Sequence, residues 1–442
     1  MIGTNILRAS LLVALCSVSF ASWSADALPS PGAELYAKMC AACHDHPKDR
    51  IPAREAIAKK TPEEIVVALT RGSMRVQSGG LNLNEQNALA EYLTGRAPSD
   101  AVLATPETNL CAAKQPLQPP SDVKGQWNGW GRDLDNSRYQ PNPGLTAADL
   151  PKLKLKWAFG YRGSSVYGQP TVVGGRVYVT SVTGRVYALD AKTGCVYWTY
   201  DAKAPVRTAA SIATVTGAGA VERQLIFFGD DTAFVYALDA ADGKLIWSKR
   251  LDNHVVARIS GAPVFYNQRL YVPVSSLEEL AAMVPGYECC KFRGSVAALA
   301  AKDGSVIWQT YTIDKLAQPS RKSKTGVQLY GPAGAAVWSA PTIDPKRNRL
   351  YVGVGNSYTD ETAPRANSIT AFDLDSGKIV WSNQLAARDN YIVGCDTPPA
   401  GVCELGKACP NGPPYCPAPV GPISISVRRQ FCARWLPVTN CC

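Results

Sequence analysis

One short motif has residue types and a spacing that point directly to chemistry. Cys40 and Cys43 are separated by two residues, and His44 follows at once. Two thiols at this spacing can form thioether bonds to the vinyl groups of one porphyrin, and the adjacent imidazole then ligates the iron. A redox-active Cys-x-x-Cys pair and half of a zinc site are the alternatives, but the chain has only 3 His and no suitable second ligand pair for zinc. The motif therefore predicts a heme c.

The elements around this motif are predicted to be helical. Residues 30–96 favour helix, with helical apolar spacing at 63–69 and 85–93. The stretch resembles a small class I cytochrome c over its whole length, including a Gly-x-x-Leu-Tyr approach to the motif. That resemblance implies that Met74 is the distal thioether ligand of the iron.

Composition restricts the class of protein. The chain has 442 residues, of which 46% are hydrophobic and 19% charged, which excludes a disordered protein. Its 36 Gly and 32 Pro argue against an all-helical fold. The net charge is +10, but the basic residues are scattered, so no nucleic-acid partner is expected.

The N-terminus has the features of an export signal. Arg8 supplies a positive region, residues 11–20 an apolar run, and Ala25-Asp26-Ala27 a cleavage site, so residues 1–27 are predicted to be a signal peptide. The apolar run is too short to span a bilayer, and no transmembrane segment is expected elsewhere. We therefore expect a periplasmic protein in which disulfides are permitted.

A repeated phrase predicts the fold of the second part of the chain. An alternating strand ends near Leu-Asp, a glycine turn reverses it, and a further strand delivers a tryptophan four residues after the glycine. Four copies favour four-stranded blades of a β-propeller over a β-sandwich. We expect a linker at 97–124 and a partial propeller at 125–422. The repeat tryptophans are Trp198, Trp247, Trp308 and Trp381.

The repeat phrase resembles the tryptophan-docking motif of pyrroloquinoline quinone (PQQ) dehydrogenases. The segment 127–139 is similar to the start of those propellers. The order of signal, cytochrome c, propeller and a cysteine-rich loop at 395–416 resembles the cytochrome-type polyvinyl alcohol dehydrogenases. Non-catalytic propellers share the docking motif, so a scaffold that carries an electron-transfer cytochrome is the alternative function.

The resemblance implies a cofactor site made of PQQ and Ca²⁺. Trp338 would be the floor on which the quinone stacks, and Asn356 a calcium ligand. Glu279 would be the calcium carboxylate, with Glu278 as the alternative if the register slips by one residue. Two serines would line the cofactor: Ser260 and Ser276.

A vicinal cysteine pair follows the predicted calcium ligand. The resemblance implies that Cys289 and Cys290 form a disulfide that caps the quinone, and that Arg293 reaches oxygen atoms of the cofactor. The order differs from that of methanol-dehydrogenase-like relatives, where the pair precedes the calcium Glu by one blade. A structural bridge and two separate disulfides are the alternatives.

The resemblance also implies a general base and a reaction. Asp389 matches the first Asp of the family stretch, whereas Ile392 stands where the second Asp would be; Asp396 is the alternative base. We expect oxidation of secondary alcohol groups of polyvinyl alcohol, or of a similar polymeric or small alcohol. Electrons would pass to the heme and then to an external acceptor, either a cytochrome or a component of the respiratory chain.

The last twenty or so residues do not continue the repeat. After Gly421-Pro422 the resembling family continues with Asp-Phe-Asp-Phe, and the same bases read one position later encode Ile-Ser-Ile-Ser, the sequence of residues 423–426. We therefore expect 423–442 to be an out-of-frame tail. The propeller would then be truncated at the C-terminus, with about half of the family's eight blades.

Overall fold

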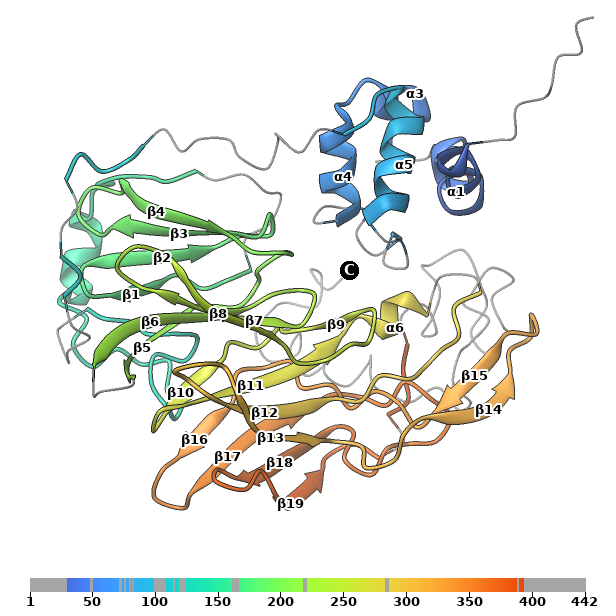
Figure 1. Ribbon diagram of the computed structural model, residues 1–442. Coiled ribbons are helices and arrows are strands. Elements are labelled where there is room, and N and C mark those ends of the chain that lie inside the picture. Colours follow the sequence, from blue (N-terminus) through green and yellow to red (C-terminus); the bar gives the residue numbers. More distant parts are fainter. Residues whose placement is uncertain are drawn as a thin grey trace, which may run out of the picture.

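The structure is a computed structural model in which helices α1 to α5 precede all of the described strands (Figure 1). Five helices lie between residues 31 and 94, and the strands lie between residues 171 and 384. No helix among the described residues is long and apolar enough to cross a membrane. The structure describes residues 30–47, 51–70, 74, 77–78, 81, 83–98, 109–113, 116–118, 125–160, 167–217, 221–282, 286–387 and 389–392.

The helical unit is organised by the crossing of its first and last helices. Ser30 caps α1 by accepting a hydrogen bond from the Ala33 N–H at 3.2 Å. Gly32 permits the crossing, because a Cβ there would lie 2.1 Å from the carbonyl oxygen of Ala88 in α5. The helices predicted at 63–69 and 85–93 are confirmed. The helices are α1 (Pro31–Met39), α2 (Ala41–His44), α3 (Arg54–Ala58), α4 (Pro62–Thr70) and α5 (Leu83–Thr94).

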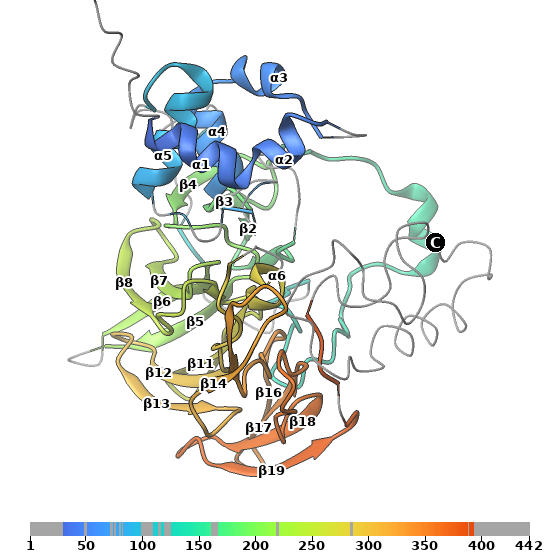
Figure 2. The same ribbon diagram turned by 90° about the vertical axis from the view of Figure 1, so that its right-hand side faces the viewer.

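In the described part of the chain, four antiparallel sheets follow one another, each with a row of four strands, and the third has a fifth strand beside that row (Figure 2). Their strands pair in chain order, as in the blades of a propeller. The first sheet contains β1 (Thr171–Val173), β2 (Arg176–Thr180), β3 (Arg185–Asp190) and β4 (Val196–Asp201); the second contains β5 (Ser211–Thr216), β6 (Glu222–Gly229), β7 (Phe234–Asp239) and β8 (Leu245–Arg250). The third contains β10 (Val264–Tyr266), β11 (Arg269–Ser276), β12 (Ser295–Ala300) and β13 (Val306–Tyr311); the fourth contains β16 (Thr342–Asp344), β17 (Arg349–Val354), β18 (Ser368–Asp373) and β19 (Ile379–Gln384).

Smaller elements complete the described part of the chain. Strand β9 pairs with β11, and a separate hairpin comes between the third and fourth sheets in sequence. The total number of blades and the closure of the propeller stay predictions, because residues 393–442 lie outside the described residues. These elements are β9 (Ala257–Arg258), α6 (Glu278–Ala281), the hairpin strands β14 (Gln318–Lys322) and β15 (Gln328–Gly331), and the 3-10 helix η2 (Ala147–Lys152).

Each repeat tryptophan except the last docks on the turn of the following sheet. Gly304 has a φ of 71°, and a Cβ there would lie 2.6 Å from the Trp247 ring, so both conformation and space require glycine. The indole N–H of Trp247 donates to the carbonyl of Ala301 at 2.9 Å. The same glycine contact joins three further pairs: Trp157 with Gly194, Trp198 with Gly243, and Trp308 with Gly377.

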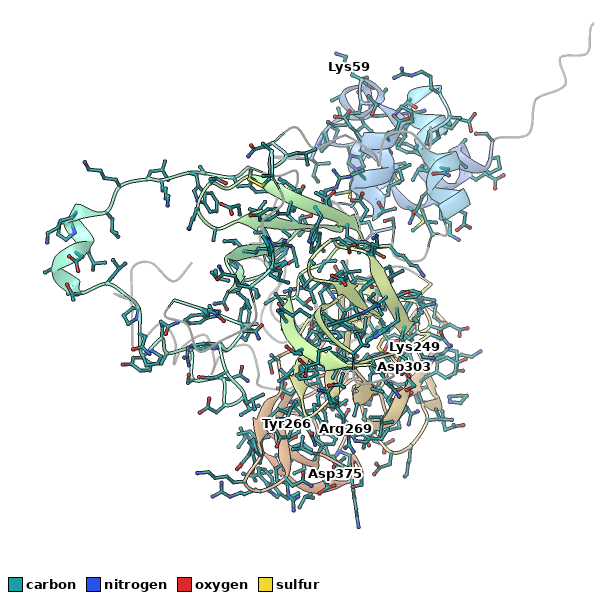
Figure 3. All side chains as sticks on the ribbon, turned by 60° about the vertical axis from the view of Figure 1, so that its left-hand side comes forward. Lys59, Lys249, Tyr266, Arg269, Asp303 and Asp375 are labelled. Atoms are coloured by element: carbon teal, nitrogen blue, oxygen red, sulfur yellow. A yellow bond between two sulfur atoms is a disulfide. The ribbon has the colours of Figure 1, made fainter. Side chains whose placement is uncertain are left out.

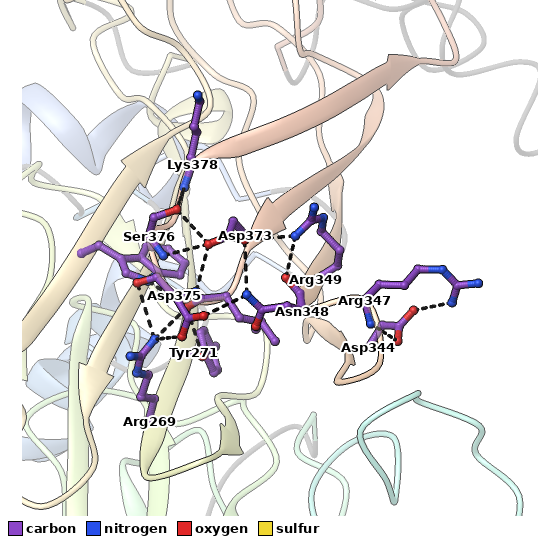
Figure 4. Close-up of polar contacts among 12 residues, drawn as sticks. Arg269, Tyr271, Asp344, Arg347, Asn348, Arg349, Asp373, Asp375, Ser376 and Lys378 are labelled. Carbon is purple, nitrogen blue, oxygen red and sulfur yellow. Dashed lines mark hydrogen bonds and ion pairs between the residues drawn. The ribbon is translucent and has the colours of Figure 1, made fainter.

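Polar contacts reinforce these junctions. Arg269 of the third sheet donates to Asp375 of the fourth at 3.0 Å, and the Tyr271 hydroxyl donates to the carbonyl of Leu374 at 3.2 Å (Figure 4). Figure 3 shows Arg269 and Asp375 in the same region of the molecule, far from Lys59 on the helical unit. The third and fourth sheets are therefore held together by an ion pair and a hydrogen bond to a main-chain carbonyl as well as by tryptophan packing.

The fourth sheet has no such neighbour among the described residues. Its Trp381 is 45% exposed, whereas Trp247 is 8% exposed. Arg349, which occupies the place of Arg269 in the repeat, pairs at 3.0 Å with Asp373 of its own sheet (Figure 4). The fourth sheet thus exposes the tryptophan surface that the preceding sheets bury against their neighbours.

Two segments before the first sheet contact the sheets. Within the expected linker, Cys111 forms a disulfide with Cys195, and Leu110 pairs with Val196 of β4, a docking that the composition did not predict. Residues 127–139, which we call the strap, pass the first strand of several sheets. Its Trp127 pairs with Val172. The strap also contacts Ile212 through Asn128 and Ile343 through Leu134.

Candidate heme site and active site

The residues of the Cys-x-x-Cys-His motif lie on α2 and at its start. His44 is 8% exposed, and its Nδ1 lies 2.8 Å from the carbonyl oxygen of Pro52. Because a carbonyl only accepts, Nδ1 carries the proton and Nε2 keeps the lone pair that an iron ion needs. Cys40 and Cys43 are both free. Burial, with a smaller contribution from Cys43, raises the pKa of Cys40 to about 11, the opposite of the low pKa that a redox-active thiol requires.

Met74 is held in place by its own backbone. Its N–H donates to the carbonyl of Ala68, and its carbonyl accepts from the N–H of Ser78, both at 3.0 Å. The side chain packs against the apolar cluster that contains Leu69 and Leu89. A thioether fixed beside this core fits the predicted distal ligand. Residues 71–73 and 75–76 lie outside the described residues.

An arginine clamp that the sequence did not reveal supports the heme motif. The Arg54 guanidinium lies 4.8 Å from the ring centroid of Tyr36 and 5.0 Å from that of Tyr92, and donates to the Tyr92 hydroxyl at 2.6 Å. Tyr36 in turn donates to Asp45 at 2.5 Å. Arg54 therefore ties the start of α3 to α1 and α5, and so helps to place the nearby carbonyl of Pro52.

Three of the predicted site residues of the propeller stand on adjacent, cross-linked segments. The Gly355 N–H donates to the carbonyl of Ala336 at 2.7 Å, which joins the loops of Trp338 and Asn356. The Ser357 N–H donates to the carbonyl of Asp389 at 3.0 Å. Trp338, Asn356 and Asp389, separated by up to fifty or so positions in sequence, are thus brought together.

Trp338 is fixed by the residues that surround it. Trp338 is half-buried, and Gly355 lies against it, since a Cβ there would be 2.8 Å from the indole Nε1. Ser260 donates to the carbonyl of Trp338 at 3.2 Å and shares a 2.7 Å hydrogen bond with Ser275. Ser276 is fully buried, and its hydroxyl accepts from the Glu278 N–H at 3.3 Å. The predicted floor residue is therefore held by the serine pair beside it.

The two consecutive glutamates on α6 differ in their environments. Glu278 is fully buried and accepts hydrogen bonds from the N–H groups of Lys291 at 2.7 Å and Phe292 at 2.8 Å, so both of its oxygens are engaged. Its Oε1 also lies 3.1 Å from His254 and accepts from the Tyr287 hydroxyl at 3.1 Å.

The carboxylate of Glu279 makes no hydrogen bond or ion pair with any other described residue. Burial raises its pKa to about 7, and the nearby Arg258 opposes that shift. A desolvated carboxylate without a partner is the better candidate for a cation ligand. The geometry therefore favours Glu279 over Glu278 for the predicted calcium site.

Asn356 and Asp389 also present oxygen atoms without partners. The Asn356 amide nitrogen donates to the carbonyls of Tyr391 at 2.8 Å and Ser357 at 3.3 Å, and none of the described residues donates to its oxygen. Asp389 is 2% exposed, and its Oδ1 is buried with no hydrogen-bond partner among the described residues. Burial raises the pKa of Asp389 to about 6. Buried carboxylate oxygens are normally satisfied, so this one points to a cation or a proton donor that completes the site.

These residues fit a calcium ion only if the amide takes part. No cluster of three His, Cys, Asp or Glu side chains suited to a metal occurs in the described part of the chain. Calcium accepts amide as well as carboxylate oxygens, so Glu279 and the Asn356 Oδ1 are a suitable pair.

The vicinal cysteines are bonded to each other. Cys289 and Cys290 form a disulfide across a cis peptide bond, which removes the alternative of two separate disulfides. They are 3% and 0% exposed and belong to the apolar cluster against which Trp338 packs. The Tyr330 N–H of β15 donates to the carbonyl of Cys289 at 2.8 Å, so the hairpin fixes the pair. Its role as a cap over the quinone stays a prediction.

Other residues are placed less directly. Arg293 donates to the carbonyls of Ile313 and Asp314 at 3.0 and 3.2 Å and stacks 4.1 Å from the centroid of Tyr311, so its contact with a cofactor stays a prediction. Ile392 is fully buried in the apolar cluster, and Asp396 lies outside the described residues.

Sequence reasoning missed Arg258. It is 1% exposed, pairs with Asp231, and acts on the charge of Glu279. No repeat position or motif marks it, because an isolated arginine between apolar residues has no distinctive spacing.

The fold and the two sites together define a cytochrome c unit joined to a quinoprotein-type β-propeller. Residues 127–402 match the β-propeller domain of glucose/ethanol/alcohol dehydrogenases, and residues 27–93 match cbb3-type cytochrome c oxidase subunit III. The chain therefore belongs to the PQQ-type glucose/ethanol/alcohol dehydrogenase β-propeller family. These matches imply heme c in the helical unit and PQQ with calcium in the propeller.

The chain is also similar to individual proteins. The chain is 45% identical to a polyvinylalcohol dehydrogenase of Pseudomonas sp over 87% of this chain and 61% of that protein. It is 39% identical to a polyvinylalcohol dehydrogenase of Sphingopyxis sp. (strain 113P3) over 95% of this chain and 66% of the relative. The chain thus spans less than two thirds of the length of either relative. The quinohemoprotein alcohol dehydrogenase ADHIIG structure from Pseudomonas putida HK5 covers 60% of this chain and 40% of its own, with 26% identity and a TM-score of 0.48.

Proposed function

We propose that this chain is an exported, periplasmic quinohemoprotein that oxidises secondary alcohol groups of polyvinyl alcohol or a similar alcohol. Electrons pass to its own heme c and from there to an external acceptor. The observation that carries the proposal is the buried, unpartnered Oδ1 of Asp389, cross-linked to the segment of Asn356. The two relatives named polyvinylalcohol dehydrogenase support the choice of substrate.

The residues of the propeller divide the work of the reaction. When bound, PQQ with its calcium ion supplies the two-electron oxidant. Trp338 provides a half-buried aromatic surface for a planar ring, while Glu279 and the Asn356 Oδ1 supply ligands to the ion. Asp389 accepts the proton of the substrate hydroxyl at Oδ1, the atom to which no described residue donates.

The helical unit holds the second redox centre. Cys40 and Cys43 form the covalent attachment, and His44 Nε2 and the Met74 sulfur ligate the iron. In this assignment the cytochrome domain comprises 30–96, the linker 97–124 and the propeller 125–422. The stretch that contains Cys111 fastens the linker to the first sheet.

The test is reduction of the protein's own heme by substrate. The full chain, loaded with PQQ and Ca²⁺, is mixed with polyvinyl alcohol, and the absorbance of the reduced heme is followed. We expect reduction that requires both additions and is lost in Asp389→Asn. Asp396→Asn is the matched control, because Asp396 is the rival base. If PQQ and Ca²⁺ change neither the heme absorbance nor the thermal midpoint, the propeller is a scaffold without quinone and the proposal is refuted.

A further inference from the structure

The strap encloses a cavity that the proposed chemistry does not use. The cavity has a volume of about 260 Å³ and lies between the strap and the strands β5 and β10. Trp130, Leu134 and Phe265 form apolar walls, while Arg132 and Ser211 contribute polar atoms. A small cavity with apolar walls and a few converging polar groups has the usual composition of a ligand site.

Ser211 is the first of two polar groups left without a partner there. It begins β5, is 7% exposed, and its hydroxyl makes no hydrogen bond within the described part of the chain. A hydroxyl withdrawn from water normally finds a partner in the protein. Because Ser211 lines the cavity, its hydroxyl is the nearest unsatisfied group of β5 to a ligand bound there.

Arg132 is the second such group. Its Nη1 pairs with Asp133 at 3.0 Å, but its Nε is buried and has no partner among the described residues. Its φ of 76° is a left-handed conformation that a non-glycine residue seldom adopts. The strap is fixed on either side of Arg132, where the Asn128 amide pairs with Ile212 at 2.7 Å and the Asn136 amide donates to Thr342 at 2.8 Å.

The charge of the cavity argues for a neutral ligand. Asp133 compensates the guanidinium of Arg132, so an anion would meet a carboxylate as well as a cation. The Arg132 Nε can donate to a hydroxyl oxygen, and the Ser211 hydroxyl can donate or accept. The apolar walls suit methylene groups. Two alcohol groups separated by a short hydrocarbon spacer satisfy all of these features.

Two residues that line the cavity are close in sequence to residues of the candidate active site. Pro263 and Ala340 line it, and they follow Ser260 and Trp338 by three and two residues. We propose that this cavity is a non-catalytic subsite that binds a 1,3-diol stretch of a hydroxylated aliphatic chain. The choice of ligand rests on the proposed function, since it is a piece of the proposed polymeric substrate.

The experiment measures binding without turnover. Pentane-2,4-diol is titrated calorimetrically into the full chain without PQQ, with propan-2-ol as the single-hydroxyl comparison. Ser211→Ala removes the hydroxyl, and Arg132→Lys keeps a cation beside Asp133 but removes the Nε–H. We expect each variant to bind the diol about tenfold more weakly, as for the loss of one hydrogen bond. Ser248→Ala, on β8 and outside the cavity lining, should bind as the unchanged chain does.

Stability separates a binding role from a structural one. Because the Ser211 hydroxyl has no partner among the described residues, Ser211→Ala should leave the thermal midpoint unchanged or raise it. A lower midpoint, diol binding that neither variant weakens, or no binding by the unchanged chain would overturn the proposal. Diol binding without any heme reduction would refute the proposed function and leave this subsite standing; heme reduction without diol binding would do the reverse.

A titration with polymer shows whether the cavity binds a diol within a polymer chain or a small free polyol. Polyvinyl alcohol replaces pentane-2,4-diol in the same titration. If Ser211→Ala weakens binding of both, the cavity holds a polymer chain. If Ser211→Ala weakens binding of the small diol alone, the cavity binds free polyols. That result still supports recognition of two hydroxyl groups, but in a small molecule rather than in the polymer.

Discussion

The helical unit and the propeller build their candidate sites in opposite ways. In the helical unit, three of the four predicted iron-binding and heme-attaching residues lie within residues 40–44, on one helix and its cap. In the propeller, the candidate residues extend from Ser260 to Asp389 and are spread over the connections of the third and fourth sheets. A local site depends on a motif, whereas a distributed site depends on the whole blade array.

The largest expected effect tests the local site. Cys40→Ser combined with Cys43→Ser removes both thioether bonds, so we expect complete loss of covalently bound heme. The propeller should be unaffected because its candidate residues lie outside the helical unit. Heme staining after denaturing electrophoresis measures attachment, and the binding of PQQ with Ca²⁺ reports on the propeller. Loss of PQQ binding in this variant would contradict the independence of the two sites.

The next effect tests the distributed site at one atom. Asp389→Asn keeps the size of the side chain but removes the proton acceptor, so alcohol-dependent heme reduction should fall about 10²- to 10⁴-fold. Heme content and the reduction of the heme by dithionite should not change. If polyvinyl alcohol still reduces the heme at the original rate, another group is the base.

The same contrast explains what the sequence could predict. Cys40, Cys43 and His44 were identified from spacing alone, since their chemistry is encoded in consecutive residues. The blade strands followed from the repeat, because the glycine that must adopt a positive φ and the tryptophan that packs on the next sheet recur at fixed spacing.

Residues that act through contacts between sheets were harder to find. Arg258, which influences Glu279, has no spacing signal because its partner Asp231 lies in another sheet. Ser211 has none because the strap residues with which it lines the cavity are distant in sequence. The choice between Glu278 and Glu279 also needed the structure, which engages both oxygens of the first with the N–H groups of Lys291 and Phe292. The docking of Cys111 on β4 was missed because composition around it resembles a linker.

A third test measures how far the propeller site depends on the packing of its sheets. Trp247 is 8% exposed and belongs to the same apolar cluster as Cys289, so Trp247→Ala should cost about 3–5 kcal/mol of unfolding free energy. Trp381 is the matched control. It is 45% exposed, and Trp381→Ala should cost less than about 1 kcal/mol. Urea unfolding followed by far-UV circular dichroism measures both, and equal losses would show that docking does not set the stability.

The smallest effect concerns the ionisation of Glu279 and Asp389 in the calcium-free protein. Burial raises the pKa of Glu279 to about 7 and that of Asp389 to about 6, above the values near 4 of unfolded chains. The folded protein therefore binds more protons than the unfolded one between about pH 4 and 7, and its stability falls as the pH rises through that window. We expect a loss on the order of 1–3 kcal/mol in the calcium-free protein between pH 5 and pH 8.

Calcium and one variant distinguish this cause from general effects of pH. Excess Ca²⁺ should raise the urea midpoint more at pH 8, where both carboxylates are ionised, than at pH 5, where protons compete with the ion. Glu279→Gln should reduce both the pH dependence and the effect of Ca²⁺, whereas Glu288→Gln, at an exposed carboxylate in the same connection, should change neither. A Ca²⁺ effect that is equal at the two pH values would mean that the ion binds away from Glu279 and Asp389. The distributed site would then lack the cation that its unpartnered oxygens indicate.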